Sequence, residues 1–96
     1  MSHFDGFNTK FIDKDCLVKA LKNLGYRPEE GGEIHGYGRS HTQVELRFRP
    51  TRDSYDIGFR KHGGRYVCVA DWFGVRGIQL RKFLESLTRE YLRVHG

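Results

Sequence analysis

The sequence predicts an α+β fold in which an antiparallel sheet of four or five strands carries two helices on one face. Segments that alternate apolar and polar residues indicate the strands, because successive side chains of a strand point to opposite faces. Two segments with apolar residues at helical spacing, one near each end of the chain, indicate the helices. The predicted order is β-α-β-β-β-β-α, and 96 residues fit a single α+β domain over residues 1–96.

Each predicted helix has a continuous apolar face. The first is expected after Asp13, whose side chain can cap a helix N-terminus, and before Gly25, a typical C-terminal stop. Its apolar face comprises Cys16, Leu17, Ala20, Leu21 and Leu24. The second helix is expected from about Gly77 to Arg93, with an apolar stripe of Leu80, Phe83, Leu84, Leu87 and Tyr91.

A hairpin over Tyr55–Asp71 is the best defined part of the predicted sheet. If Gly63-Gly64 is its two-residue loop, Phe59 lies opposite Cys68. Directly opposed residues share a face, so this register places one apolar set on the core side: Tyr55, Ile57, Phe59, Cys68, Ala70 and Trp72. Further strands are expected at Phe7–Phe11, Ile34–Tyr37 and Val44–Phe48, with a turn at Glu29–Glu33.

Composition limits the classes of function. Seventeen Lys and Arg against twelve Asp and Glu give a net charge of +5, which favours acidic partners. The two cysteines are not clustered and the histidines lack metal-ligand spacing, so no disulfide, metal or cofactor is expected. The N-terminus lacks signal-peptide features and no apolar run could span a membrane, so we expect no membrane insertion and a cytosolic or plastid-stromal location.

The hairpin register also brings two acids together on the outer face of the sheet, where Asp56 falls opposite Asp71. If Phe48 pairs with Ile57, Arg49 falls opposite Asp56 and can neutralise both carboxylates. The alternatives are a catalytic or metal-binding carboxylate pair and a structural ion-pair network. The network is favoured, because no nucleophile is nearby and the ligands for a metal are too few.

The outer face is also the expected partner-binding surface. The strand aromatics point to the core, which argues against base stacking, while Val67 and Val69 remain outside and favour a protein contact. The predicted surface comprises Arg47, Arg49, Asp56, Gly58, Arg60, Val67, Val69 and Asp71.

A basic stripe on the last helix offers an alternative, nucleic-acid-binding function. It comprises Lys82, Arg89 and Arg93. A glycine-rich segment, Gly36–His41, is expected to be a turn and not a phosphate loop, because it lacks a third glycine and leads into a strand.

Several short motifs resemble an uncharacterised family, the hypothetical chloroplast reading-frame products numbered thirty-five, of plastids, cyanobacteria and other bacteria. They are Met1-Ser2-His3-Phe4, Leu17-x-x-Ala20-Leu21-x-x-Leu24-Gly25, Gly36-Tyr37, Tyr55-Asp56-Ile57-Gly58-Phe59, Ala70-Asp71-Trp72 and Leu87-Thr88-x-x-Tyr91. The resemblance implies no established activity. An association with genes for AAA-type ATPases suggests an accessory or adaptor role.

Members of that family usually continue past the segment that matches Leu87–Tyr91, whereas this chain stops at Gly96, so we expect either a short member or a fragment. The hypothesis from the sequence is a non-enzymatic adaptor module that binds a protein, with a nucleic-acid-binding domain as the alternative. An enzyme or metal site at Asp56 and Asp71 is the least favoured reading.

Overall fold

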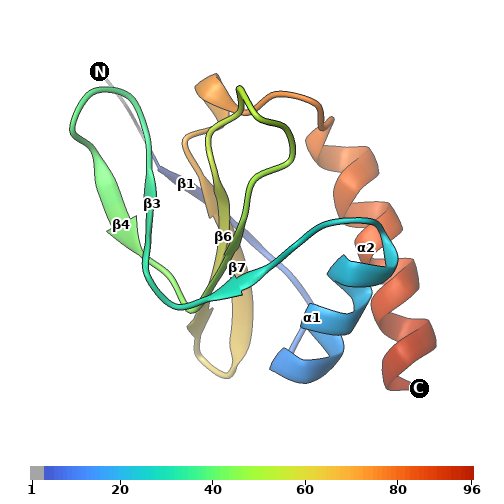
Figure 1. Ribbon diagram of the computed structural model, residues 1–96. Helices are drawn as coiled ribbons and strands as arrows, with labels where there is room; N and C mark the ends of the chain where they lie inside the picture. The colour runs from blue at the N-terminus through green and yellow to red at the C-terminus, as the bar shows by residue number, and fades with distance from the viewer. Residues whose placement is uncertain (1–3) are drawn as a thin grey trace.

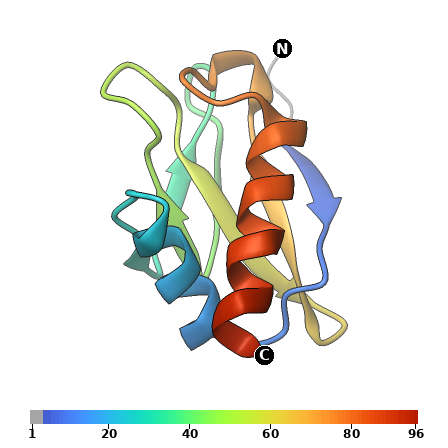
Figure 2. The ribbon, with the colours of Figure 1, turned by 90° about the vertical axis from the view of Figure 1, so that its right-hand side faces the viewer.

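The chain folds into three layers, as the computed structural model shows for residues 4–96. Both helices cover one face of a five-stranded sheet, and a two-stranded hairpin lies over the other face (Figures 1 and 2). Residues 1–3 lie outside the described residues. They include most of the motif Met1-Ser2-His3-Phe4 and the start of the segment that lacks signal-peptide features.

The main sheet is antiparallel throughout. Its strands in spatial order are β1 (Asp5–Asn8), β7 (Arg65–Ala70), β6 (Ile57–His62), β5 (Leu46–Phe48) and β2 (Glu29–Glu30). The second sheet pairs β3 (Glu33–His35) with β4 (His41–Gln43). The helices are α1 (Lys14–Asn23), a 3-10 turn η1 (Trp72–Gly74) and α2 (Leu80–His95). The predicted α+β class is confirmed.

The predicted ends of α1 are confirmed. The Asp13 carboxylate accepts a hydrogen bond from the Cys16 backbone N–H at 3.1 Å, which caps the first turn. Gly25 follows the last turn with a φ of +95°, and the next N–H, that of Tyr26, donates to the Leu21 carbonyl at 3.0 Å. These local bonds set where the helix begins and ends.

The main core lies between the helices and the sheet. Phe59 pairs with Cys68 as predicted, and both are buried with Ile57 and Ala70. Trp72, expected on the same side, is half-buried against this core. The helices contribute the buried residues Leu17, Ala20, Leu21, Phe83, Leu87 and Tyr91.

The segment from Glu29 to Phe48 differs from the expectation. The predicted strand at Val44–Phe48 is shorter, since β5 begins at Leu46, and the strand expected at Ile34–Tyr37 pairs only within the second sheet. The Glu29–Glu33 segment, expected to be a turn, contains β2 and the start of β3. The strand expected at Phe7–Phe11 lies earlier, as β1.

One long hairpin runs through both sheets. Glu30 pairs with Leu46 in the main sheet and Glu33 pairs with Gln43 in the second, so the register is continuous. Between these pairs Gly31 and Gly32 have φ values of +70° and +88°, which side chains other than glycine rarely adopt. The hairpin bends there and its distal part, Glu33–Gln43, folds over the sheet; we call this part the outer hairpin.

Candidate functional site

The outer face of the main sheet is covered by the outer hairpin. Val69 is only 1% exposed and forms a second small core with Ile34 and Val44, while Val67 is half-buried beside them. Gly58 is buried under Val44, whose Cγ1 would lie 2.5 Å from a Cβ at that position. The expectation that Gly58, Val67 and Val69 form an exposed partner surface is therefore wrong, because the chain's own hairpin occupies that face.

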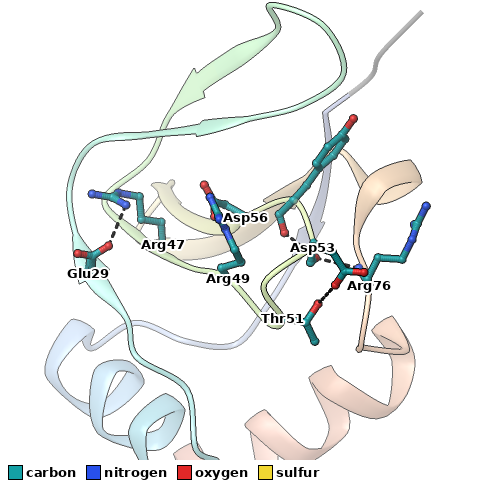
Figure 3. Close-up of polar contacts among 9 residues, drawn as sticks. Glu29, Arg47, Arg49, Thr51, Asp53, Asp56 and Arg76 are labelled. Carbon is teal, nitrogen blue, oxygen red and sulfur yellow. Dashed lines mark hydrogen bonds and ion pairs between the residues drawn. The ribbon is translucent and has the colours of Figure 1, made fainter.

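Two arginines predicted for the same surface bond to the long hairpin, Arg47 at its bend and Arg60 in the outer hairpin. Arg47 donates from Nε to the Gly31 carbonyl at 2.9 Å and pairs with Glu29 at 3.0 Å, next to the bend (Figure 3). Arg60 donates to the Thr42 hydroxyl of β4 at 3.3 Å. Both guanidinium groups thus bind parts of the same long hairpin.

The two acids do not form the expected opposed pair. Regular β6–β7 pairing ends at Gly58 and Val69, so Asp56 and Asp71 lie beyond the ladder. Arg49 reaches Asp56 at 3.1 Å, as predicted, but does not neutralise Asp71 (Figure 3). Among residues 4–96 no three His, Cys, Asp or Glu side chains lie together in an arrangement that could hold a metal ion.

Asp71 instead joins two loops that are far apart in the sequence. Its side chain is 2% exposed, and its carboxylate accepts hydrogen bonds from the backbone N–H of Tyr37 at 3.0 Å and of Phe73 at 3.3 Å. Tyr37 belongs to the loop of the outer hairpin and Phe73 to η1, which Asp71 caps. This carboxylate therefore fastens the end of the outer hairpin to the main sheet.

The residues that Asp71 holds carry exposed aromatic rings. Tyr37 is 60% exposed and Phe73 is 84% exposed. Arg39 lies in the same hairpin loop as Tyr37, and Arg76 follows η1; both are exposed. We call Tyr37, Arg39, Phe73 and Arg76 the aromatic tip. The loop between β3 and β4 and the short helical turn that follows β7 lie at the same end of the molecule (Figure 1).

The η1 half of the aromatic tip is held from several sides. Arg76 donates from Nη1 to the Phe73 carbonyl at 3.0 Å, and its backbone N–H donates to the Ser54 hydroxyl at 2.8 Å. The Tyr55 N–H donates to the Gly74 carbonyl at 2.9 Å, and a Cβ on Gly74 would lie 2.1 Å from the Tyr55 ring. Phe73 therefore projects from a fixed backbone.

The sequence interpretation missed the aromatic tip. The sequence predicts a turn and not a phosphate loop at Gly36–His41, and it gives no role to Phe73. One local signal was available, since Asp71 precedes an aromatic pair and Gly74, as an N-cap precedes a short helical turn. The contact between Asp71 and Tyr37 spans 34 residues and has no local signal.

The three basic residues proposed on α2 are exposed, as expected. Arg93 pairs with Glu90 at 3.3 Å. Lys82 lines a groove of about 280 Å³ beside Tyr26, whereas Arg89 lines a different groove. The stripe therefore borders two separate depressions. Within residues 4–96 no helix has the length and apolar character to cross a membrane.

Both cysteines are free thiols, and neither is placed as a nucleophile. Cys68 is buried in the main core, and burial raises the pKa of its thiol. Cys16 is half-buried, and desolvation raises its pKa as well. Their expected role as small buried apolar groups fits these positions.

Fold and site together define a small α+β domain in which a sheet is covered by helices on one side and by its own hairpin on the other. The chain belongs to the family described as "Protein of unknown function (DUF1257)", whose profile matches residues 20–94. It is similar to "Uncharacterized protein ycf35" of Cyanophora paradoxa, with 28% identity over 94 residues, covering 95% of this chain and 72% of the relative. No solved structure matches the chain significantly.

Proposed function

We propose that this domain is a non-enzymatic accessory module that binds a protein partner through the aromatic tip. The observation that carries the proposal is the buried Asp71 carboxylate, which holds the backbones of Tyr37 and Phe73 while both rings stay exposed. The aromatic tip replaces the outer face as the contact surface, because the outer hairpin already covers that face.

The composition of the aromatic tip supports a protein contact. Tyr and Arg are among the residue types that dominate binding energy at protein interfaces, and the tip contains both together with an exposed Phe. A fixed backbone lowers the ordering cost of binding. The two carboxylates once considered as a catalytic pair are instead engaged, Asp56 by Arg49 and Asp71 by backbone N–H groups.

Affinity capture from a native host tests the proposal with Phe73→Ala and Tyr37→Ala. We expect both variants to lose a partner that the unchanged domain captures, and the affinity of the purified pair to fall at least about tenfold. Ile12→Ala is the matched control, because Ile12 is also an exposed apolar residue but lies before α1. Equal capture by Phe73→Ala, Tyr37→Ala and the control would refute the aromatic tip as the contact surface.

The same capture examines the partner class suggested by the resemblance, an AAA-type ATPase. A nucleic-acid-binding role is the second candidate, favoured by the exposure of Lys82 and Arg89 on α2 and by the net charge of +5. Fluorescence anisotropy with a single-stranded oligonucleotide at low salt tests this role, and Lys82→Glu/Arg89→Glu should weaken the binding.

A further inference from the structure

A second surface lies at the other end of β7, beside α2. One depression of about 330 Å³ is lined by Asn8, Thr9, Lys10, Arg65, Leu84 and Thr88. An adjoining one of about 510 Å³ is lined by Leu84, Glu85, Thr88, Arg89 and Leu92. Leu84 and Thr88 line both, so the two depressions lie side by side along α2; together we call them the α2 groove.

Two leucines of α2 give the lining of the α2 groove an apolar part. Leu84, Thr88 and Leu92 follow one another at four-residue spacing and form a row about 12 Å long. Leu92 is 57% exposed although it is a large apolar side chain. A partner with apolar side chains at matching spacing would bury this row.

The rim of the α2 groove is basic. Lys10, Arg65 and Arg89 are exposed, and none of them forms an ion pair with another residue of the described chain, 4–96. Glu85 is the one acidic residue that lines it. Of the lysines and arginines of residues 4–96, only Lys14, Arg47, Arg49 and Arg93 have an acidic partner. Most basic side chains are therefore unpaired, and this rim is distinguished because three of them line the same groove.

We propose that the α2 groove binds an acidic, amphipathic peptide segment of a partner protein. The apolar side chains of the peptide lie on Leu84 and Leu92, and its carboxylates meet Lys10, Arg65 and Arg89. Because the rim is basic, charge complementarity requires that the bound peptide be acidic. The lining residues include no aromatic ring, and stacking on aromatic rings is how proteins hold single-stranded bases, so a peptide fits this groove better than nucleic acid.

A fluorescently labelled synthetic peptide with Leu and Glu at helical spacing is the probe, and its Lys-for-Glu counterpart is the reference peptide. Fluorescence anisotropy at low and at physiological salt measures binding to the full chain. We expect the acidic peptide to bind and the basic one not to bind. The combined variant Lys10→Glu/Arg65→Glu should weaken binding by at least about tenfold, and Leu92→Asp should weaken it similarly.

Arg52→Glu is the matched control for the single variant Arg65→Glu, because Arg52 is also an exposed arginine but lies in the β5–β6 turn. Circular dichroism checks that each variant is folded. Retained binding in Arg52→Glu, with amide NMR shifts at Asn8, Arg65 and Thr88, supports the proposal. An equal loss of peptide affinity in Arg52→Glu would overturn the proposal. The absence of any binding of the acidic peptide at low salt would overturn it as well.

A second ligand and one further variant separate this proposal from the other two. A single-stranded oligonucleotide that binds the same residues while the acidic peptide does not would overturn the peptide assignment and favour nucleic acid. Phe73→Ala should leave peptide affinity unchanged, because Phe73 follows β7 and Arg65 begins it, roughly 20 Å away along an extended strand. Loss of the peptide in Phe73→Ala would assign its binding to the aromatic tip instead.

Discussion

At the scale of single residues, Asp71 has the clearest structural role. A carboxylate that is almost fully removed from water is costly unless hydrogen bonds satisfy it, and here two backbone N–H groups do so. One of these bonds caps η1 and the other reaches the loop of the outer hairpin. Asp71, which was expected to lie opposite Asp56, therefore has a structural role: it connects the outer hairpin to η1.

We expect Asp71→Ala to lower the free energy of unfolding by about 2–3 kcal/mol, because the backbone N–H groups of Tyr37 and Phe73 lose their acceptor. Asp71→Asn keeps one acceptor oxygen and should cost less. Urea denaturation measures both values. Asp56→Asn is the control and should cost less than about 1 kcal/mol, because its Arg49 partner is largely exposed. A loss at Asp71→Ala no greater than that of the control would contradict this role.

At the scale of elements, the hairpin from Glu29 to Phe48 decides the shape of the outer layer. Its register does not change between the two sheets, so no residue is inserted at the bend. The positive φ values of Gly31 and Gly32 turn the ladder, and the Arg47 side chain bonds to the Gly31 carbonyl there. The bend at these two glycines thus allows the distal part of the hairpin to pack over the main sheet.

The cover fits because Gly58 has no side chain. We expect Gly58→Ala to cost about 2 kcal/mol, since its new methyl group would meet the stiff, branched side chain of Val44. In a Val44→Ala background the same change should cost at least about 1 kcal/mol less, because the space is then free. Chemical denaturation of the four variants in this double-mutant cycle measures the coupling. Additive costs would show that Val44 does not press on Gly58.

At the scale of the whole molecule, the centre of the main sheet is buried on both faces. Helices and outer hairpin leave Cys68 on one side and Val69 on the other with almost no exposure. Burial raises the pKa values of three weakly acidic groups, the thiol of Cys68 and the phenols of Tyr26 and Tyr66.

This burial predicts loss of stability at alkaline pH. The unfolded chain can ionise its thiols above the ordinary pKa of 9.0, whereas folded Cys68 keeps its proton. Its contribution to stability is therefore fully present below about pH 9 and is lost as the pH rises further. We expect the free energy of unfolding, measured by urea denaturation between about pH 7 and about pH 10.5, to fall above about pH 9.

Cys68→Ala should reduce the steepness of that fall, and Cys16→Ala, at a half-buried position, should reduce it less. The comparison uses the change with pH and not the absolute stability, because Cys68→Ala also leaves a cavity at every pH. The same slope in Cys68→Ala and in the unchanged chain would exclude the thiol as a cause.

Much of the fold was predictable because its signals are local. Asp13 and Gly25 set the two ends of α1 through hydrogen bonds within a few residues. Gly63-Gly64 sets the register that pairs Phe59 with Cys68. Of the candidate site, Arg47, Gly58, Arg60, Val69 and Asp71 do lie on the outer face, but each contacts the chain's own hairpin. Which surface stays exposed was not predictable from alternation.

Whether a feature could be predicted from the sequence depends on how far apart in the chain the interacting residues lie. Capping bonds, helical periodicity and the two-glycine turn act between near neighbours, and these alone specify both helices, the β6–β7 hairpin and the α+β class. The alternation of apolar and polar residues predicts that Val69 and Cys68 face opposite sides of the sheet. It does not predict whether water or protein covers each side. Only packing over long sequence distances decides that the outer hairpin covers Val69 and that Asp71 holds Tyr37 beside Phe73, since those contacts exist once the chain has closed on itself.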